Sequence, residues 1–375
     1  MRRIYVWEQP AWPVLAFDSE PLVGPLGRAR YGQGEVQGAV RNLGFVQRQN
    51  IEVDARTEDA VETSAIEGAT VSRSSVRSSV ARRLEAAGAG AATDPYAEGV
   101  TSMILDATRK HAEGLTLERL FGWQAGLFPR ARGASSRTTV GAFRDDASGP
   151  MQVVSGRVDA PIVHYEAPPA GRLRDEMEHF ITWFNGPPAI DGLVFAGIAH
   201  LWFVTIHPFD DGNGRIARAI ADTALSRAEQ SPFRYVSMTA QIAREKNAYY
   251  EHLERAQRGD LNVTPWLKWF LECYYRATQR SLETINNVLA RSKFWSHAHE
   301  AGISARNKYV LERLLEDDWQ GFLTTPKYAK LANVSLDTAQ RDIADLALKQ
   351  LIVRNPGGSK KTSYSLRSFD DWATP

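Results

Sequence analysis

The feature that most limits how this chain can fold is an almost unbroken apolar run, Leu193 to Ile206. Its fourteen residues are too few to cross a bilayer as a helix, which takes about 20 apolar residues. His200 is the one ionisable residue within the run. A helix that is apolar on every side is stable only where neighbouring elements cover it. The run therefore predicts a buried helix in the core of a globular domain.

The twelve residues after this run, HPFDDGNGRIAR from His207 to Arg218, are dense in polar groups. Gly212, Asn213 and Gly214 fall where the next helix is expected to begin. Glycine lets backbone N–H groups converge without a Cβ in the way, and a helix N-terminus carries partial positive charge. The segment therefore predicts a nest for phosphate oxygens.

The charged residues of the same segment suit phosphate chemistry. Arg215 and Arg218 are one helical turn apart, so that both guanidinium groups can reach one polyphosphate. Asp211 offers a carboxylate beside the nest, which suits Mg²⁺ when phosphates and waters supply its other ligands. His207 can accept a proton from an attacking hydroxyl, because the ordinary pKa of histidine is near neutral. The glycines lack both the Lys-Ser/Thr pair of a Walker loop and the spacing of a Rossmann motif.

These twelve residues resemble the signature of the Fic family at every defining position. Most members of that family transfer AMP from ATP to hydroxyl groups of proteins. The resemblance implies that His207 is the general base and that Asp211 holds Mg²⁺. It also implies in-line attack by a Ser, Thr or Tyr hydroxyl on the α-phosphate, with release of pyrophosphate. The residues implied to bind the phosphates are Gly212, Asn213, Gly214, Arg215 and, at the γ-phosphate, Arg218.

A β-prone run flanked by Gly and Ser in GAFRDDASGPMQVVSG predicts a short hairpin. The segment is similar to the flap of the Fic family, which pairs with the target protein by strand addition and brings its hydroxyl to the base. An ordinary surface hairpin is the alternative. The residues assigned to the edge of the flap are Met151, Gln152, Val153 and Val154.

A later segment, EKNAYYEHLERAQRGDLNVTPWLKWFL, resembles the helical region that walls the adenine pocket in the same family. The resemblance makes Asn247 and Tyr250 candidates for contact with the base of the nucleotide. Tyrosines at helical spacing are also common core residues, so both interpretations of Tyr250 stay open.

An earlier segment, TSAIEG from Thr63 to Gly68, resembles the inhibitory motif of this family. That motif is a Ser or Thr, three further residues, a Glu, and then Gly or Asn. The resemblance implies that Glu67 pairs with Arg218 at the place of the γ-phosphate, so that ATP binds only unproductively. A helix-ending Glu-Gly on a surface turn is the alternative. In some family members the same Glu helps to remove AMP, and the sequence leaves both activities open.

Residues 300–375 follow a different pattern of helix, helix, turn and helix, with a hairpin signal in GGSKKTSYSL. The segment looks like a winged-helix domain, with Ser335 to Leu346 as recognition helix and Ser359 to Tyr364 as wing. Three aspartates on that helix would be repelled by phosphate, which leaves protein contact or dimerisation as the alternative to DNA binding. The residues expected to contact DNA are Thr338, Gln340 and Arg341 in a groove, with Lys360 and Lys361 on phosphates.

Apolar spacing near 3.6 residues predicts a mainly α fold: a Fic-type helical core with a β-hairpin flap, a helical N-terminal domain and a C-terminal winged helix-turn-helix. The predicted domains are residues 1–95, 96–290 and 300–375, with a linker at Glu85 to Pro95. The Trp-rich start also looks like a domain often fused to Fic cores. The predicted helices are Val36–Ile51, Ala55–Ile66, Leu115–Leu127, Arg172–Asn185, Gly192–Ile206, Arg215–Arg227, Ala240–Gln257 and Thr264–Leu289.

Composition bounds the class of protein further. A formal net charge of +1 gives no overall attraction to nucleic acid or membranes. The single cysteine, Cys273, excludes an intramolecular disulfide and a cysteine-based zinc site, and it is expected in the core. No signal peptide is recognisable at the N-terminus, so a cytoplasmic protein without a membrane partner is expected. The family resemblance also implies a homodimer.

The sequence thus predicts a protein adenylyltransferase that uses ATP and Mg²⁺ and is inhibited by its own Glu67. The acceptor is a hydroxyl of another protein or of the chain itself. Two alternatives stay open. One is a DNA-binding regulator whose Fic core only senses nucleotide, and the other is a Fic enzyme that moves phosphocholine, UMP or phosphate.

Overall fold

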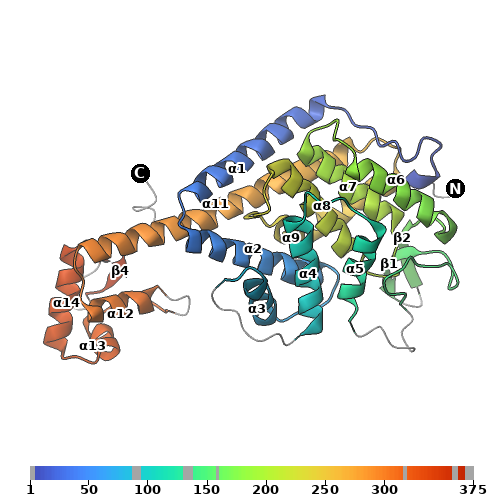
Figure 1. The fold of residues 1–375 in the computed structure, drawn as a ribbon. Coiled ribbons are helices and arrows are strands. Elements are labelled where there is room, and N and C mark those ends of the chain that lie inside the picture. The colour runs from blue at the N-terminus through green and yellow to red at the C-terminus, as the bar shows by residue number, and fades with distance from the viewer. Residues whose placement is uncertain are drawn as a thin grey trace. The chain divides into compact units, whose positions relative to one another are not determined.

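The chain divides into two compact units, residues 1–282 and residues 283–375, and each is described by itself (Figure 1). The predicted mainly α fold is confirmed, because the described strands form only two small sheets of two strands each. The segment that precedes the predicted catalytic core lies in the same unit as that core. The computed structural model describes residues 5–86, 94–129, 138–157, 160–315, 319–356 and 362–367.

The first unit is built mainly of helices packed on one another. Several of its helices begin at side-chain caps, such as Thr116 before α5 and Asp191 before α7, which accept from backbone N–H groups of the first turn. The described helices of this unit are α1 (Val23–Arg41), α2 (Phe45–Ile66), α3 (Arg73–Arg83), α4 (Pro95–Arg109), α5 (Leu117–Leu127), α6 (Leu173–Asn185), α7 (Gly192–Ile206), α8 (Asn213–Glu229), α9 (Met238–Arg244), α10 (Lys246–Arg258) and the first part of α11 (Thr264–Glu300).

The apolar run forms α7, and every residue from Leu193 to Ile206 is buried, as predicted. Helices α6, α8 and α10 pack against it. A Cβ on Gly197 would come within 2.9 Å of the Leu267 side chain, so this glycine allows α11 to approach α7 closely. The Trp266 indole on α11 donates to the Gly197 carbonyl at 2.8 Å. Because α7 is held on these sides, its C-terminal end has a fixed position in the unit.

One predicted helix, Val36–Ile51, is wrong in its extent. The chain leaves the helix after Arg41 and starts the next one at Phe45, with Gly44 extended at the N-cap. The apolar spacing continues across this break through Leu43, which is 4% exposed. Periodicity alone therefore does not reveal where α1 ends and α2 begins.

The predicted helix Ala240–Gln257 is also wrong, because it is two helices, α9 and α10, that meet at Glu245. The Glu245 carboxylate accepts two hydrogen bonds from Arg276 of α11, at 2.6 and 2.5 Å, which fix this joint. Helix α11 in turn runs on to Glu300, well beyond its predicted end at Leu289. These helix boundaries depend on side-chain contacts between helices, which the spacing of apolar residues in the sequence does not predict.

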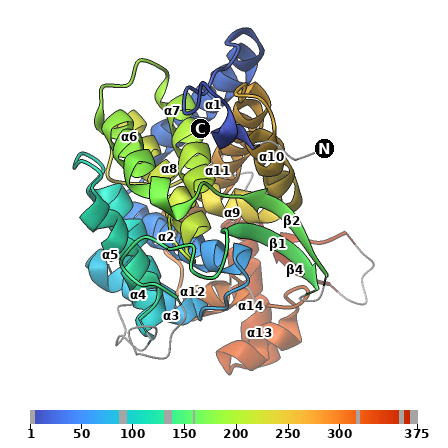
Figure 2. The same cartoon turned by 90° about the vertical axis from the view of Figure 1, so that its right-hand side faces the viewer.

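The predicted hairpin is present and longer than predicted. Strand β1 (Gln152–Arg157) pairs antiparallel with β2 (Ala160–Glu166), with a shift of register after Val153. The two strands extend side by side from the helical part of the unit (Figure 2). At the base of the hairpin, the buried Tyr165 hydroxyl donates to the Thr205 carbonyl at 2.6 Å. The hairpin is therefore fixed to the last turn of α7.

The second unit has the predicted order of helices followed by a hairpin. Ser335 caps its third helix by accepting from the Thr338 N–H at 3.2 Å, so this helix starts where predicted. The assignment as a winged helix stays a prediction, and Lys360 and Lys361 lie outside the described residues. Its elements after α11 are α12 (Ala305–Leu314), α13 (Thr325–Ala332), α14 (Leu336–Leu348), β3 (Ile352–Arg354) and β4 (Tyr364–Leu366).

Two predictions from composition can be compared with the fold. Cys273 is fully buried on α11, and burial raises the pKa of its thiol well above the ordinary value, so its role as a core residue is confirmed. Among the residues that the structure describes, no helix is both long and apolar enough to cross a membrane.

Candidate active site

The polar segment after α7 forms a tight loop between two helices. His207 ends α7 in the left-handed conformation, with φ 53° and ψ 57°, and Gly212 precedes α8 with φ 94°. A left-handed non-glycine residue is uncommon and persists only where surrounding contacts hold it. At Gly212 the positive φ explains the glycine directly. The loop therefore reverses the chain and places His207 beside the N-terminus of α8.

Contacts within the loop hold this turn. The Asn213 side chain bridges the backbone of Phe209: its Oδ1 accepts from the N–H at 3.0 Å and its Nδ2 donates to the carbonyl at 2.7 Å. The Phe209 ring is fully buried and packs on Phe121, Phe143 and Phe203. Asn213, predicted as a phosphate ligand, thus uses its side chain to shape the loop and has only its backbone N–H left for an anion.

Arg144 is a residue of this site that sequence reasoning missed. Its side chain is fully buried, and its Nε donates to the His207 carbonyl at 2.8 Å. It also donates to the Pro168 carbonyl at 2.6 Å and pairs with Asp146 at 3.0 Å. Its backbone N–H donates to the Pro208 carbonyl at 3.1 Å. One guanidinium therefore ties the loop to the base of the hairpin.

Replacing Arg144 by alanine is expected to destabilise the first unit by about 2–3 kcal/mol, because buried carbonyls and a carboxylate lose a charged donor. Chemical denaturation of the wild type and the variant measures this change. Arg28→Ala is a suitable control, since Arg28 is 52% exposed in a 3.4 Å ion pair and should change stability by less than about 0.5 kcal/mol. Equal stabilities of the two variants would contradict the assigned role.

His207 is held as a neutral base. Its Nδ1 lies 3.1 Å from the Val204 carbonyl, so Nδ1 carries the proton and Nε2 is left as acceptor. Burial lowers the pKa of His207 to about 4, helped by the nearby guanidinium of Arg144, although Glu67 and Asp211 oppose the shift. The ring is therefore neutral at neutral pH, and its Nε2 is able to take a proton.

Asp211, in the loop just before α8, pairs with Arg215 in the first turn of that helix. The Asp211 carboxylate is 57% exposed, and its Oδ1 accepts from Arg215 at 2.8 Å and from the Gly212 N–H at 2.5 Å. No hydrogen bond to Oδ2 occurs in the described part of the chain. Arg215 itself is buried and lies over the Phe128 ring, 5.1 Å from its centre. One carboxylate oxygen thus stays open to solvent beside the helix terminus.

Arg218 is fixed by the end of α2. Its Nε donates to the Thr63 hydroxyl at 2.8 Å, and its Nη2 donates to the Thr63 carbonyl at 3.1 Å and to Glu67 Oε1 at 2.8 Å. The side chain of Arg218 is 2% exposed. The predicted pairing of Glu67 with Arg218 is therefore present, and Thr63 of the same motif is the second partner. Gly68 follows with φ 76°, the left-handed residue that ends the helix.

The Glu67 carboxylate also lies directly over the glycine turn. A Cβ added to Gly214 would stand 2.2 Å from Glu67 Oε1 and 3.3 Å from Arg218 Nη1. Burial alone would raise the pKa of Glu67, but the guanidinium of Arg218, helped by Arg215 and His207, holds it below the ordinary value. Glu67 is therefore an anion bound between a helix N-terminus and two arginines, which is the environment expected for phosphate.

Two further residues, Tyr96 and Lys246, hold the end of α2 at the site. No motif in the sequence predicts either of them. The Tyr96 hydroxyl donates to Ser64 Oγ at 3.1 Å and accepts from Arg215 at 3.2 Å. Lys246 donates to the Ile66 carbonyl at 2.7 Å. These contacts hold the last turn of α2 from the sides of α4 and α10.

The two residues predicted at the adenine pocket differ in their positions. The Tyr250 hydroxyl lies 3.4 Å from the Ile66 carbonyl, at the end of α2, and burial together with Glu67 raises its pKa to about 12. Asn247 is exposed and makes none of the hydrogen bonds found in the described ranges. The structure brings Tyr250 to the edge of the phosphate-like site, and the adenine contact of both residues stays a prediction.

The four residues predicted at the flap edge lie at the start of the hairpin. Gln152, Val153 and Val154 are on β1, and the Met151 carbonyl just before it accepts from Ala167 at 2.9 Å. Val154 is 52% exposed. Within the described sheet β1 pairs only with β2, so its other edge is available to an added strand.

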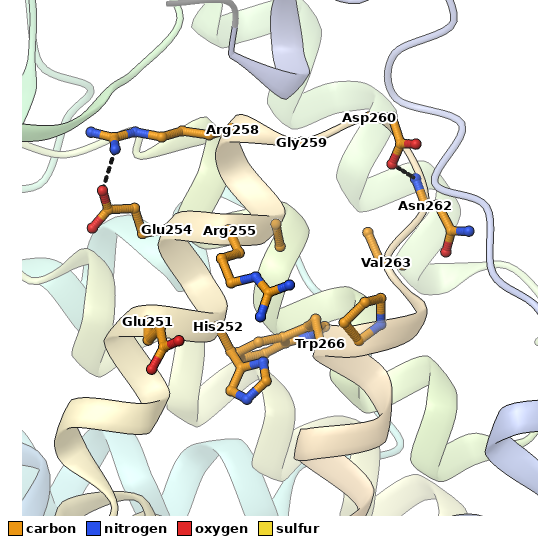
Figure 3. Close-up of a pocket in the computed structure, with 12 residues that line it drawn as sticks. Glu251, His252, Glu254, Arg255, Arg258, Gly259, Asp260, Asn262, Val263 and Trp266 are labelled. Atoms are coloured by element: carbon orange, nitrogen blue, oxygen red, sulfur yellow. Dashed lines mark hydrogen bonds and ion pairs between the residues drawn. The ribbon is translucent and has the colours of Figure 1, made fainter.

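A cavity of about 610 Å³ lies between α10 and the start of α11, and Figure 3 shows its lining side chains. Arg255 points into the space above Trp266, while Glu254 and Arg258 form an ion pair on the opposite side (Figure 3). None of the residues that line it belongs to the loop from 207 to 218. The candidate active site is therefore assigned from the chemistry of the loop, and not from the size of a cavity.

The predicted DNA-contact residues lie on α14 in the second unit. Gln340 and Arg341 are exposed, while Thr338 is half-buried and its hydroxyl lies 3.0 Å from Ser335 Oγ. Asp342, one of the aspartates expected to repel phosphate, is paired with Arg306 at 2.7 and 3.1 Å. Ion pairing within the unit thus offsets part of that repulsion.

Two segments of the chain match known protein families. Residues 114–225 match the Fic/DOC family, and residues 5–86 match a domain of unknown function, DUF4172. The chain is similar to the protein adenylyltransferase Fic of Aedes aegypti, 35% identical over 118 residues, which are 31% of this chain and 21% of that protein. It is also similar to the protein of the same name from Nematostella vectensis, 32% identical over 154 residues, 40% of this chain and 33% of that one. The chain thus matches a third or less of the length of these curated relatives.

Solved structures share the fold. A Fic family protein from Desulfovibrio desulfuricans G20 aligns with a TM-score of 0.56 and 18% identity over 94% of this chain and 97% of that chain. Fic-1 from C. elegans aligns with a TM-score of 0.52 and 19% identity over 72% and 75%. The segment that carries the HPFDDGNGRIAR loop thus matches the Fic/DOC family, within a chain whose fold is similar to that of solved Fic proteins.

Proposed function

We propose that the chain transfers AMP from ATP to a hydroxyl group of a protein, and that Glu67 inhibits this reaction. The observation that carries the proposal is the juxtaposition of a neutral His207 with an anion site made by the α8 N-terminus and Arg218. A carboxylate already fills that anion site, which supports its capacity for phosphate. The relatives named protein adenylyltransferase Fic support AMP as the transferred group.

The phosphates of ATP would lie along the glycine turn. Backbone N–H groups of the first turn of α8 have no partners within the helix and carry its partial positive charge. Arg215 and Arg218 supply two further positive groups there, both buried against water. Charge developing on the phosphates in the transition state would therefore meet donors already in place.

The donor set also fits Mg²⁺. Asp211 offers one exposed carboxylate oxygen beside the phosphate site, and a single protein carboxylate is common where phosphates and waters complete the shell of Mg²⁺. When bound, the metal would neutralise phosphate charge. Arg215, which holds the other oxygen of Asp211, orients the carboxylate for this role.

His207 would act on the acceptor hydroxyl. Its Nε2 takes the proton as the hydroxyl oxygen forms a bond to the α-phosphorus, the bond to the β-phosphate oxygen breaks, and pyrophosphate leaves. The Val204 carbonyl keeps the other nitrogen protonated, so that Nε2 faces the reaction with its lone pair. Arg144 fixes the backbone of the same residue.

The pH dependence of the reaction should report this histidine. Because the pKa of His207 is lowered to about 4, the base form persists through the weakly acidic range. We expect kcat/KM of the Glu67→Gly variant to stay level from about pH 8 to about pH 5 and to fall only near pH 4. An inflection close to 6.5, the ordinary pKa of histidine, would contradict the buried, neutral state assigned here.

Inhibition would follow from the position of Glu67. Its carboxylate occupies the space over Gly214 and takes up one donor of Arg218, so that a γ-phosphate cannot use the same place. ATP would then bind with its α-phosphate out of line with the acceptor. Because the pKa of Glu67 is lowered, its carboxyl group is ionised at neutral pH and the contact with Arg218 persists there.

Mass spectrometry of the modified protein tests the proposed activity. The Glu67→Gly variant is incubated with ATP and Mg²⁺ alone and with a cell lysate, and the products are digested and sequenced. Peptides that carry adenylate on Ser, Thr or Tyr are expected. A phosphate, uridylate or phosphocholine adduct, obtained when the matching donor is supplied and absent with ATP, would replace AMP as the group transferred.

DNA binding by the second unit is a separate candidate, favoured by the exposed Gln340 and Arg341 on a helix whose Asp342 is neutralised by Arg306. We expect Arg341→Ala to weaken binding of the full chain to its selected sequence by roughly 5- to 100-fold. Selection from a random duplex library followed by a binding titration measures this. Failure to enrich any sequence would remove this candidate without affecting the transfer activity.

A further inference from the structure

The outer part of the β1–β2 hairpin is tied to α10 by a chain of three side chains. Ser155 Oγ on β1 lies 2.6 Å from His164 Nε2 on β2, and His164 Nδ1 lies 2.8 Å from Glu254 Oε2 on α10. The order of atoms fixes the tautomer of a neutral ring: Nδ1–H donates to the carboxylate and Nε2 accepts from the serine. Both ring nitrogens are thus satisfied, and both strands are linked to the helix.

A second contact beside the first strengthens the attachment. Arg258 donates to the Val163 carbonyl of β2 at 2.7 Å and forms an ion pair with Glu254. Figure 3 shows this pair on α10, with Arg258 and Glu254 facing one another. Glu254 is therefore held by Arg258 while it holds His164.

The hairpin needs this support. An isolated two-stranded hairpin is marginally stable in water. Most of β1 is exposed, including Val154 at 52%, and Ile162 on β2 is 58% exposed. The base of the hairpin is fixed by Tyr165 on α7, but four residues of β1 extend beyond that point. The contacts to α10 are what positions this outer part.

We infer that His164 is a positioning residue for the protein substrate: together with Glu254 it holds the docking edge of the hairpin in register with the nucleotide site. This inference rests on the proposed transfer activity. The geometric argument is that α10 carries Glu254 one helical turn after Tyr250, which contacts the end of α2 beside Glu67. The same helix therefore borders the phosphate-like site and fixes the edge on which an acceptor strand would lie.

The effect should appear in the binding of the acceptor and not in the chemical step. An acceptor that pairs with a loose strand must order that strand when it binds, which weakens its affinity. Once bound, its hydroxyl meets the same His207 and the same phosphate donors. We expect His164→Ala, made in the Glu67→Gly background, to raise the KM for the acceptor roughly 10-fold and to change kcat by less than about 2-fold.

The assay uses the full chain, ATP, Mg²⁺ and, as acceptor, the most strongly labelled lysate protein after purification. Ile162→Ala is the matched control, because it shortens an exposed side chain on the same strand and should leave the KM unchanged. Glu254→Ala should also raise the KM for the acceptor, and the effects of the two changes should not add in the double variant, since both break the contact between His164 and Glu254. The KM for ATP should not move.

Hydrogen exchange provides a readout that needs no activity. Amides of β1 and β2 should exchange faster in His164→Ala than in Ile162→Ala, while α7 and α8 stay protected. If His164→Ala exchanges faster but keeps the same KM for the acceptor, the inference is overturned. It is also overturned if the variant does not exchange faster. If the Glu67→Gly parent labels no protein, the proposed function is overturned instead. Hydrogen exchange would then still test whether His164 attaches the hairpin to α10.

Discussion

Glu67→Gly is expected to raise AMP incorporation by roughly 10- to 100-fold over the wild type at equal ATP concentration. The variant removes a charge-assisted hydrogen bond to Arg218, and such bonds contribute about 1.5–3 kcal/mol. It also clears the carboxylate from the space over Gly214. Each 1.36 kcal/mol corresponds to a factor of ten in the population of the open site, which gives the stated range.

The measurement is the initial rate of label transfer from ATP labelled in its α-phosphate. Thr63→Val serves as an informative companion, because it removes the hydroxyl that accepts from Arg218 Nε and keeps Glu67. It should raise the rate by a smaller factor than Glu67→Gly. Equal rates for the wild type and Glu67→Gly would contradict inhibition by this residue.

Arg234→Ala is expected to destabilise the first unit by about 3–5 kcal/mol. Arg234 is 0% exposed and pairs with Glu229 at 2.8 Å and Asp222 at 3.3 Å. Without it, both carboxylates stay buried without their cation. Burial raises the pKa of Asp222, and the nearby carboxylate of Asp59 raises it further, so the variant would leave a strongly disfavoured anion in the core.

Further buried charges near Arg234 belong to α2 and α8. Asp59 on α2 accepts from the Ser237 hydroxyl at 2.5 Å and pairs with Arg56, which donates to the Val236 carbonyl at 3.1 Å. Asp222 lies on α8. Loss of Arg234 should therefore loosen α2 and α8 together, well before it affects the second unit.

Thermal unfolding measures the effect, with a fall in Tm of roughly 10 °C expected for a unit of this size. Arg174→Ala is the matched control: Arg174 is 71% exposed in a 3.7 Å pair with Glu178, and its loss should shift Tm by less than about 2 °C. A similar Tm for Arg234→Ala and Arg174→Ala would show that the buried ions contribute little.

Local sequence was enough to predict the parts of the site that lie close together along the chain. The burial of Leu193 to Ile206, the turn at Gly212 and the helix that starts at Asn213 all follow from residues within a few positions of one another. The pairing of Glu67 with Arg218 came from a short motif combined with the loop, and the structure confirms it.

The remaining parts depend on contacts between distant segments. Arg144 contacts the loop at His207, and Tyr96 contacts Arg215, each from a distant part of the chain. The residues next to them in the sequence do not indicate these roles. The break at Glu245 depends on Arg276 of another helix. The family resemblance implies a phosphate contact for Asn213, but it does not reveal that the side-chain amide bridges the backbone of Phe209. Tertiary packing decides such roles.

The proposal at the centre of this account is that His207 is the general base for AMP transfer and that Glu67 inhibits the reaction. The most direct test incubates Glu67→Gly and Glu67→Gly/His207→Ala with labelled ATP, Mg²⁺ and a cell lysate, and compares the label in lysate proteins. The single variant should label them at least about 100 times faster than the double variant, since loss of a general base lowers rates by about that factor or more. Equal labelling by the two variants would contradict the account.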